Sequence, residues 1–318
     1  PVPLRQALAS SYNIPAVRMA REIEPTVLLN SFRKAGLFSL RKPAEFYGVG
    51  LTLGNGEVTL LELARAYAGI ARGGLLPSIS FVRDEQARLQ YANQPYAHTT
   101  PNGLSPQITY LITHILSDPE ARTPAFGRGN VLELPFSMAA KTGTSKDYRD
   151  NWVVGYTPIH TVAVWVGNFD GSPMQYVSGI SGAGPILHDM MLTLGPGGDF
   201  SVPHAIEEAV VCPTSGKRPG AFCPTVKKEI FFLGTIPKDT CAVHQSIKIN
   251  IETGGLADHQ TPSALVREEL FTVYPPEYHA WMLENGLRLP PRNTEINLPT
   301  TSQNWSYTDL LQVQYPAS

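Results

Sequence analysis

The chain has 318 residues, of which 42% are hydrophobic and 16% are charged, with a formal net charge of -2. This length and apolar content support a real core, in one large domain with a smaller second part. The small net charge gives no electrostatic basis for nucleic-acid binding, and no apolar run reaches transmembrane length. Because the sequence starts at Pro1, without an initiator methionine or a signal peptide, we expect it to be a piece of a longer protein.

The first helical pattern is followed at once by a polar tripeptide. Residues 3–9 predict a short helix, and Ser11-Tyr12-Asn13 comes directly after it. Serine and asparagine commonly cap helices or form turns, so a purely structural role is the simplest interpretation. A second helix is predicted from Pro25 to Ala35, because proline suits the first helical turn and Gly36 can close the end.

Three later helices are predicted mainly from their ends. A capping box at residues 59–62 starts the first, and Gly73-Gly74 ends it. Ser105-Pro106 starts the second, whose apolar residues recur at three- and four-residue spacing and so predict one buried face. The third is expected to span residues 182–192.

The stretch around Lys141 carries the strongest strand pattern. Lys141-Thr142-Gly143-Thr144 follows a short apolar run, and two runs rich in Val, Trp and Tyr come after it, at residues 151–157 and 161–167. Such residues favour strands, and the Pro158-Ile159-His160 segment between the runs fits a hairpin loop. We therefore predict that Lys141 lies on a sheet strand with its ammonium directed along a cleft. Gly143 leaves the backbone open to a ligand.

The composition of the chain changes after about residue 196, where Gly and Pro cluster and apolar periodicity weakens. Cys212, Cys223, Cys241 and His244 lie in this part. Three thiols and a Cys-x-x-His could bind zinc, but the spacing is loose and the first two cysteines form no close pair. The preferred expectation is a Cys212–Cys223 disulfide with Cys241 left over, and no metal or other cofactor. Zinc stays open as the alternative.

Several stretches together resemble class A penicillin-binding proteins, and most closely their 1C branch. Ser11-Tyr12-Asn13 is similar to the Ser-x-Asn element of the family, and Lys141-Thr142-Gly143 to its Lys-Thr-Gly element. Ser-x-Asn is a weak signal alone, but its combination with Lys-Thr-Gly in this context is specific. The resemblance covers nearly the whole chain and also includes residues 51–59, 124–127, 149–158 and 212–216.

The resemblance implies both a fold and a reaction. The fold is α/β (α+β), a serine β-lactamase- or D,D-peptidase-like transpeptidase with a central antiparallel sheet flanked by helices, here expected to be N-terminally truncated. In the reaction, a serine attacks the penultimate D-Ala carbonyl of a peptidoglycan stem peptide, and an amine of a neighbouring stem then attacks the acyl-enzyme. Penicillin mimics the D-Ala-D-Ala end and traps the serine. The expected domains are a transpeptidase domain at residues 1–196 and a Gly/Pro-rich C-terminal extension at 197–318.

The resemblance also assigns roles to single residues. Lys141 would supply positive potential for the substrate carboxylate, Ser11 would pass a proton to the leaving amine, and Asn13 would hold the substrate amide. The backbone amide of Thr144 would stabilise the oxyanion. The implied catalytic residues are Ser11, Asn13 and Lys141, and the implied substrate-binding residues are Thr142, Gly143 and Thr144.

The family's nucleophile signature, Ser-x-x-Lys, is not found where the family would place it. Ser39-Leu40-Arg41-Lys42 matches the letters, but it follows the helix-ending Gly36, comes after Ser11 and precedes Pro43, so we predict a solvated loop instead. We expect the nucleophile helix upstream of Pro1, with the glycosyltransferase domain and membrane anchor usual for the class. The chain alone is therefore expected to be inactive.

The implied partners are peptidoglycan stem peptides, β-lactams and other cell-wall synthesis proteins. No nucleic acid is expected, and membrane attachment is expected only through the absent anchor. The implied location of the parent protein is the periplasmic side of the bacterial inner membrane. Two other functions stay open. One is a non-catalytic module that binds peptidoglycan or a partner. The other is a β-lactamase-like hydrolase, which is disfavoured because no deacylation glutamate can be identified.

Overall fold

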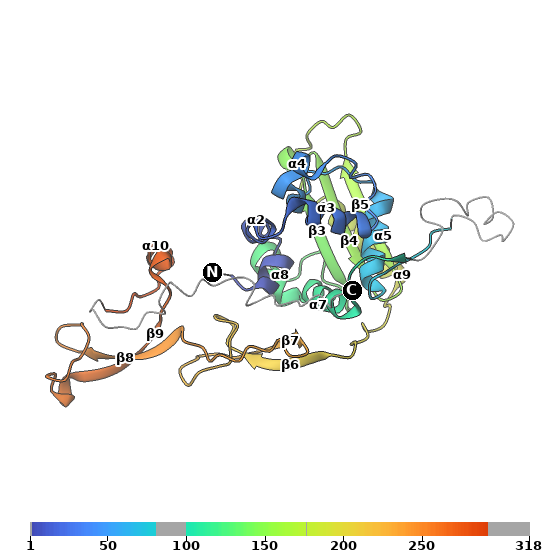
Figure 1. Ribbon diagram of the computed structural model, residues 1–318. Helices are drawn as coiled ribbons and strands as arrows, with labels where there is room; N and C mark the ends of the chain where they lie inside the picture. Colours follow the sequence, from blue (N-terminus) through green and yellow to red (C-terminus); the bar gives the residue numbers. More distant parts are fainter. Residues whose placement is uncertain (1, 81–99, 176, 292–318) are drawn as a thin grey trace. The chain divides into compact units, whose positions relative to one another are not determined.

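The computed structural model describes residues 2–80, 100–175 and 177–291, which fall into two compact units (Figure 1). The N-terminal unit is Val2–Ala205, and the C-terminal unit is the described part of Ile206–Ser318. The expected extension beyond residue 291 lies outside the described residues. No helix in the described ranges is long and apolar enough to cross a membrane.

The N-terminal unit contains more helices than strands in its described part, and the predicted helix starts are confirmed. The Thr59 hydroxyl accepts a hydrogen bond from the Glu62 backbone, and the Glu62 carboxylate accepts one from the Thr59 backbone, so the capping box forms. The Ser105 hydroxyl caps the helix that follows it. The helices are α1 (Leu4–Ala9), α2 (Asn13–Arg21), α3 (Pro25–Lys34), α4 (Ala44–Tyr47), η1 (Gly48–Leu53), α5 (Leu60–Ala71), α7 (Pro106–Leu116), α8 (Pro119–Phe126), η2 (Lys146–Tyr148) and α9 (Ala183–Leu194).

Among the described residues, the main sheet of this unit has three antiparallel strands in the order β3-β4-β5. They are β3 (Ala139–Thr144), β4 (Asp150–Tyr156) and β5 (Thr161–Gly167), and a separate short pair is formed by β1 (Leu75–Leu76) and β2 (Thr100–Pro101). In the predicted hairpin loop, the Thr157 amide donates to the His160 carbonyl at 2.9 Å. The predicted strands around Lys141 and the hairpin after it are therefore confirmed.

Helices cover both faces of this sheet, as the expected fold requires. On one face, Val153 of β4 packs with Leu187 and Met191 of α9, and all three are fully buried. On the other face, Tyr156 packs with Leu116 of α7 and residues of α5. A residue occupies one face or the other according to its parity along the strand. Lys141 therefore projects from the face that α5 and α7 cover, and not toward α9.

Arg122 of α8 holds together the segments that lead into β3. Its side chain is 2% exposed, and its guanidinium donates to the carbonyls of Leu116, Leu132 and Met138 at 2.8, 3.3 and 3.5 Å. Burial lowers the pKa of Arg122, an effect that the nearby carboxylate of Glu133 opposes. Because one planar group satisfies carbonyls from three separate segments, it fixes where β3 begins.

Replacing Arg122 is expected to destabilise the N-terminal unit strongly. Arg122→Ala leaves three backbone carbonyls without this donor and opens a cavity, so we expect a loss of about 3–5 kcal/mol in the free energy of unfolding. Urea unfolding followed by tryptophan fluorescence measures this loss. Arg128→Ala is the matched control, because Arg128 is 75% exposed and pairs with the exposed Glu120, and it should change stability by less than about 1 kcal/mol. Equal losses in the two variants would contradict this account.

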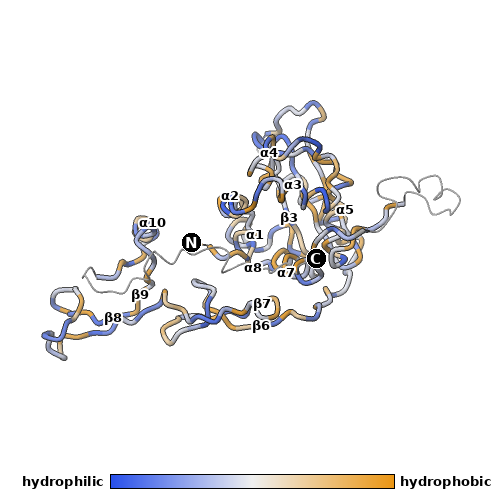
Figure 2. The backbone as a smooth tube through the Cα atoms, in the orientation of Figure 1, coloured by the Kyte–Doolittle hydropathy of each residue, from blue (hydrophilic) through white to orange (hydrophobic). Residues whose placement is uncertain are grey.

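The C-terminal unit is built from two separate hairpins. Its elements are β6 (Ile206–Val211), β7 (Lys227–Phe232), β8 (His244–Asn250), η3 (Ser263–Leu265), β9 (Val266–Thr272), η4 (Pro276–Tyr278) and α10 (His279–Glu284). β6 pairs only with β7, and β8 pairs only with β9, among the described residues. Its buried apolar cluster consists of Ile247, Ile249, Phe271 and Val273. Figure 2 shows polar and apolar residues mixed along these strands.

The segment after Ser246 contains most of the β8–β9 hairpin. Its strand signal in the sequence is weak, since only Ile247 and Ile249 alternate with polar residues in β8. After this hairpin, Tyr274 and Trp281 pack on each other, with their ring centroids 5.7 Å apart. Pairing between the two strands and packing of their side chains therefore stabilise a hairpin whose local strand pattern is weak.

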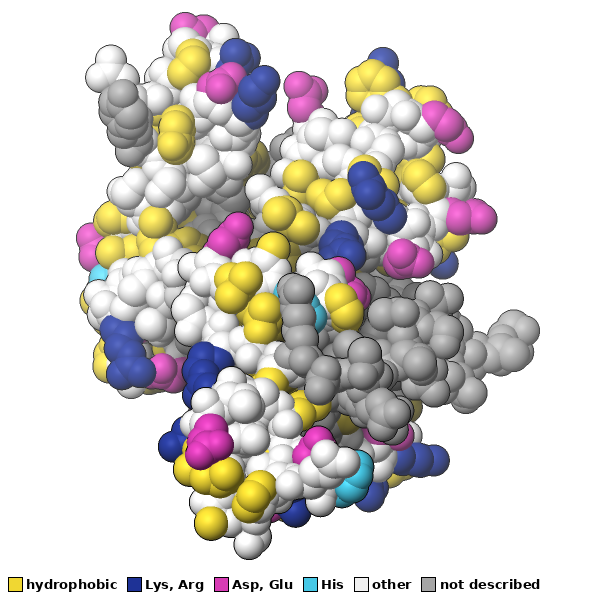
Figure 3. Space-filling view, turned by 90° about the vertical axis from the view of Figure 1, so that its left-hand side faces the viewer, with side chains coloured by type: hydrophobic (Ala, Val, Ile, Leu, Met, Phe, Trp, Pro, Cys, Tyr) yellow, Lys and Arg dark blue, Asp and Glu magenta, His cyan; other side chains and the backbone are white. Residues whose placement is uncertain are grey.

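Charges of both signs are interspersed on the surface. Figure 3 shows acidic and basic side chains among apolar ones, with no single-signed patch on the face that it draws. This agrees with the formal net charge of -2. Exposed apolar side chains such as Phe169 and Ile14 also occur, as on most protein surfaces.

Candidate active site around Lys141 and Ser11

The fold brings together Lys141 and Ser11, which are 130 residues apart in the sequence. The Lys141 ammonium donates to the Ser11 hydroxyl at 2.5 Å and to the Thr142 carbonyl at 2.8 Å. A charged donor at this distance from a hydroxyl makes a strong hydrogen bond. Each member of the pair can therefore influence the proton of the other.

Ser11 occupies the turn between α1 and α2, and its backbone has a conformation that residues other than glycine rarely adopt. Its φ angle is +58°, in the left-handed region. The turn is held by hydrogen bonds from the Ser11 amide to the Leu8 carbonyl and from the Tyr12 amide to the Ala7 carbonyl. Such a backbone costs of order 1–3 kcal/mol and is frequent at functional sites, where the surroundings hold it in place. Neither Ser11 nor Asn13 caps α2, whose cap position is Tyr12.

Helix α1 is held against α7 and α8 by buried polar contacts, and these place Ser11. The Arg5 guanidinium donates to the His114 carbonyl at 3.1 Å and pairs with the Asp118 carboxylate at 3.3 Å. The Ser10 hydroxyl, next to Ser11, donates to the Ala121 carbonyl at 2.9 Å. Because Arg5 and Ser10 are both buried, the position of the Ser11 turn is fixed from two sides.

Burial changes the acidity of Lys141. It lowers the pKa of Lys141 to about 8, because the charged form loses hydration in this partly buried place. Lys141 is thus mostly cationic at neutral pH, yet it releases its proton far more readily than an exposed lysine does. This suits both attraction of a carboxylate and exchange of a proton with Ser11.

β3 lies at an edge of the described sheet, because it pairs with β4 and with no other described strand. An edge strand can accept an extended peptide as a further strand, through its free backbone groups. Gly143 adds no side chain between that backbone and a ligand. Gly179, which lies outside the strands, packs so closely on β3 that a Cβ there would lie 2.6 Å from the Gly143 carbonyl oxygen.

The other predicted site residues lie on these same elements. Thr142 and Thr144 point to the opposite face of β3 from Lys141, by strand alternation. The Thr144 hydroxyl accepts a hydrogen bond from the Gly179 amide at 2.9 Å, so its own proton stays available for donation. Asn13 is the first residue of α2, and it is exposed. The contact with Gly179 was not predicted, because its loop shows only a run of small residues.

Ser39 is placed as a loop residue, in agreement with the rejection of Ser39–Lys42 as a nucleophile signature. It lies in the turn after α3, where its backbone amide donates to the Glu62 carboxylate at 3.0 Å. The Lys42 ammonium lies over the Phe46 ring, 5.9 Å from its centroid, and it is exposed. The segment therefore lacks the helix N-terminus on which a Ser-x-x-Lys nucleophile depends.

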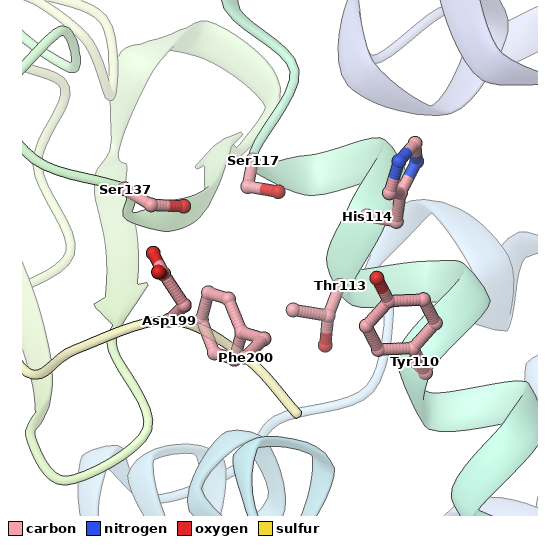
Figure 4. Close-up of a pocket in the computed structure, with 7 residues that line it drawn as sticks. All are labelled: Tyr110, Thr113, His114, Ser117, Ser137, Asp199 and Phe200. Carbon is pink, nitrogen blue, oxygen red and sulfur yellow. The ribbon is translucent and has the colours of Figure 1, made fainter. Parts of the chain in front are cut away.

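A cavity of about 180 Å³ lies beside α7 (Figure 4). It contains none of the predicted site residues and is smaller than the usual volume of ligand pockets, roughly 300–1,000 Å³. Figure 4 shows the Phe200 ring between Asp199 and Thr113. Phe200 also packs against Tyr156 of the sheet, so this cavity belongs to the packing of the unit. Its lining residues are Tyr110, Thr113, His114, Ser117, Ser137, Asp199 and Phe200.

The expected disulfide between Cys212 and Cys223 was wrong. All three cysteines are free thiols in this structure, and Cys212 and Cys241 are buried. Together with His244 they form one cluster in the C-terminal unit. The spacing in the sequence did not predict this, because β7 and its connections separate the residues along the chain.

Comparisons with known proteins match two ranges of the chain. The profile of the penicillin binding protein transpeptidase domain matches residues 1–192. The profile of the penicillin-binding protein 1A C-terminal domain matches residues 202–246.

Two related proteins and one solved structure are also similar to this chain. Penicillin-binding protein 1A of Clostridium botulinum is 27% identical over 317 residues, which cover 93% of this chain and 38% of that protein. The protein of the same name from Neisseria lactamica is 31% identical over 64% of this chain and 26% of its own length. The crystal structure of penicillin-binding protein 1A from Haemophilus influenzae matches 76% of this chain and 41% of that one, with a TM-score of 0.57 and 22% identity. The last match supports the fold alone.

Proposed function

The chain belongs to the penicillin-binding protein transpeptidase family, and from this premise we propose that it forms part of a class A D,D-transpeptidase. Such an enzyme cross-links peptidoglycan stem peptides through a serine acyl-enzyme and binds β-lactams. The chain spans 38% of the length of its Clostridium botulinum relative, so the activity proposed is that of a longer protein. Assignment to the 1C branch stays a prediction, since the relatives named above are 1A proteins.

The observation that carries this proposal is the 2.5 Å hydrogen bond between Lys141 and Ser11. A Lys-Thr-Gly strand and a Ser-x-Asn turn are each weak signals, but here the two side chains that matter meet across 130 residues. The left-handed φ of Ser11 is a second, independent sign of a functional turn.

The proposed roles follow from charge and geometry. Lys141 attracts the carboxylate at the end of the stem peptide, and its lowered pKa lets it exchange a proton with Ser11. Ser11 in turn delivers a proton to the departing D-Ala amine. The exposed Asn13 holds the substrate amide, and the backbone amide of Thr144 stabilises the oxyanion. The substrate backbone pairs with the free edge of β3 beside Gly143.

The nucleophile is proposed to lie outside this sequence, on the Ser-x-x-Lys helix that the family resemblance implies. Residues 1–196 would then form the rest of the transpeptidase domain, and residues 197–318 the extension. The proposed location is the periplasmic side of the inner membrane, and stem peptides, β-lactams and other cell-wall synthesis proteins are the proposed partners. The alternative is a non-catalytic module that binds peptidoglycan or a partner. Such a module would not require the Ser11–Lys141 pair.

The pH dependence of peptide binding tests the role of Lys141. Because burial lowers the pKa of Lys141 to about 8, the side chain is cationic below that pH and increasingly neutral above it. We therefore expect the affinity for a stem peptide that ends in D-Ala-D-Ala to fall as the pH rises from about 7 to about 9.5. Titrations of this chain followed by NMR measure the dissociation constant at each pH.

A peptide with an amidated C-terminus is the control for this titration. It carries no terminal carboxylate, so its binding should be weak and should not fall across the same pH range. Lys141→Met should remove the pH dependence for the acid peptide, whereas Lys34→Met, at an exposed position of α3, should keep it. An equal fall for both peptides would show that Lys141 does not receive the carboxylate.

A further inference from the structure

Four side chains that can ligate a metal converge in the C-terminal unit, far from the Lys141 site in the sequence. The ligand atoms of Cys212, Cys223, Cys241 and His244 all lie within 4.8 Å of one another. Cys212 and Cys241 are 0% and 8% exposed, and Cys223 and His244 are half-buried. The proposed reaction gives no role to any of these four side chains.

The distances within the cluster fit a tetrahedrally coordinated metal ion better than a disulfide. The Cys212 and Cys241 sulfurs are 3.7 Å apart, and His244 Nδ1 is 3.5 Å from each of them. Zinc bonds of about 2.3 Å to sulfur and about 2.0–2.1 Å to nitrogen, at tetrahedral angles, put two sulfurs about 3.8 Å apart and sulfur and nitrogen about 3.5 Å apart. A disulfide needs its sulfurs about 2.0 Å apart. Three edges of the cluster therefore have the length of a zinc tetrahedron.

Cys223 supplies the fourth corner. Its sulfur lies within 4.8 Å of the other ligand atoms, so a movement of roughly 1 Å brings it to the tetrahedral distance. The Gly220 amide donates to this sulfur at 3.2 Å. Amide donors of this kind stabilise the thiolates that a metal requires.

The ligands come from both hairpins of the unit. Cys212 directly follows β6, and Cys223 lies in the β6–β7 connection. Cys241 lies in the β7–β8 connection, and His244 is the first residue of β8. Backbone hydrogen bonds already join these segments: the Cys241 amide donates to the Arg218 carbonyl at 2.8 Å. An ion held by all four ligands would tie one hairpin to the other.

The unit also needs such a tie, because its core is small. Two-stranded hairpins are marginal by themselves, and small domains with few buried apolar residues commonly rely on a metal or a disulfide. The buried apolar cluster of this unit contains four residues, all from the β8–β9 hairpin and the residue after it. In the described part of the unit, the Cys/His cluster is where both hairpins meet around shared side chains.

We propose that Cys212, Cys223, Cys241 and His244 form a structural zinc site that ties the β6–β7 hairpin to the β8–β9 hairpin. His244 binds through Nδ1, the nitrogen that faces the sulfurs. Four protein ligands close the coordination sphere, so the role is structural and not catalytic. On binding, the three thiols release their protons to solvent.

Metal content of the whole chain tests the proposal. Purified under reducing conditions and measured by mass spectrometry of the elements, it should carry about one zinc ion per chain. Cys241→Ser and His244→Ala should lower that content several-fold or more. His259→Ala is the matched control, because His259 is exposed in the same unit outside the cluster, and it should keep the zinc. Zinc retained in full by Cys241→Ser and His244→Ala would overturn the proposal.

A titration covers the case in which the variants fail to fold. The wild-type chain, stripped by a chelator, should take up one equivalent of Co²⁺ with the near-ultraviolet absorption of thiolate–cobalt bonds, and Zn²⁺ should displace it. Mg²⁺ should not. Absence of this absorption in reduced chain, or a Cys212–Cys223 disulfide found by peptide mapping of freshly isolated metal-free protein, would overturn the proposal. Neither result would bear on the Lys141 site.

Discussion

Labelled penicillin incubated with this chain alone is expected to leave no covalent band on a denaturing gel. Loss of the nucleophile from a well-studied serine hydrolase lowers its rate on the order of a millionfold. In their proposed roles, Lys141 and Thr144 stabilise charge and do not attack the β-lactam carbonyl, so they are not expected to restore that rate. Ser39 does not restore it either, since its segment is a turn whose Lys42 lies over Phe46.

The positive arm of this experiment is a longer protein in which the proposed Ser-x-x-Lys segment precedes the chain. That protein should be labelled in stoichiometric amount, at the serine of the segment, and heat-denatured protein should not be labelled. A covalent adduct mapped to Ser11 or Ser39 of the chain alone would contradict the proposed site. Failure of the folded longer protein to react would favour the non-catalytic binding module.

In the longer protein, loss of either member of the Ser11–Lys141 pair is expected to slow acylation by roughly 10²–10³-fold. This is the usual cost of one well-placed donor to a developing charge, and the 2.5 Å contact shows that the two groups share one hydrogen bond. Stopped-flow measurement with a chromogenic cephalosporin gives the second-order rate constant of acylation for Ser11→Ala and Lys141→Ala.

The double variant shows whether the two residues act as a unit. If each works through the other, Ser11→Ala with Lys141→Ala together should be little slower than the slower single variant. Fully multiplicative effects would mean that the hydrogen bond has no part in acylation. Lys146→Ala is the control for general charge, because Lys146 is exposed five residues beyond Lys141, and it should react at nearly the wild-type rate.

The backbone at Ser11 needs a control of its own. Alanine keeps a Cβ in the left-handed conformation and removes the hydroxyl, whereas glycine removes both the hydroxyl and the strain. Ser11→Gly should therefore be as slow as Ser11→Ala in acylation, while it unfolds at a higher denaturant concentration than Ser11→Ala. This comparison separates the chemistry of the hydroxyl from the stability of the turn.

The sequence by itself determined the elements whose signals are local. Val, Trp and Tyr in residues 151–157 and 161–167 predicted two strands and the hairpin between them, and the structure confirms both. Thr59 and Glu62 predicted a helix start, and their reciprocal hydrogen bonds confirm it. These predictions succeed because strand propensity, helix capping and turn formation depend on residues within a few positions of one another.

Only the tertiary structure decided which distant side chains meet. Ser11 reaches Lys141 because buried contacts of Arg5 and Ser10 hold α1 against α7 and α8, and no local pattern records such contacts. The left-handed backbone of Ser11, in the turn between α1 and α2, is likewise seen only in the folded chain.

The cysteines show the same division. Their order along the chain favoured a disulfide between Cys212 and Cys223, but two hairpins bring Cys241 and His244 to the same point. Spacing in sequence measures the length of the connecting chain. The distance between side chains depends on how the strands pair and pack, and that is a property of the folded chain as a whole.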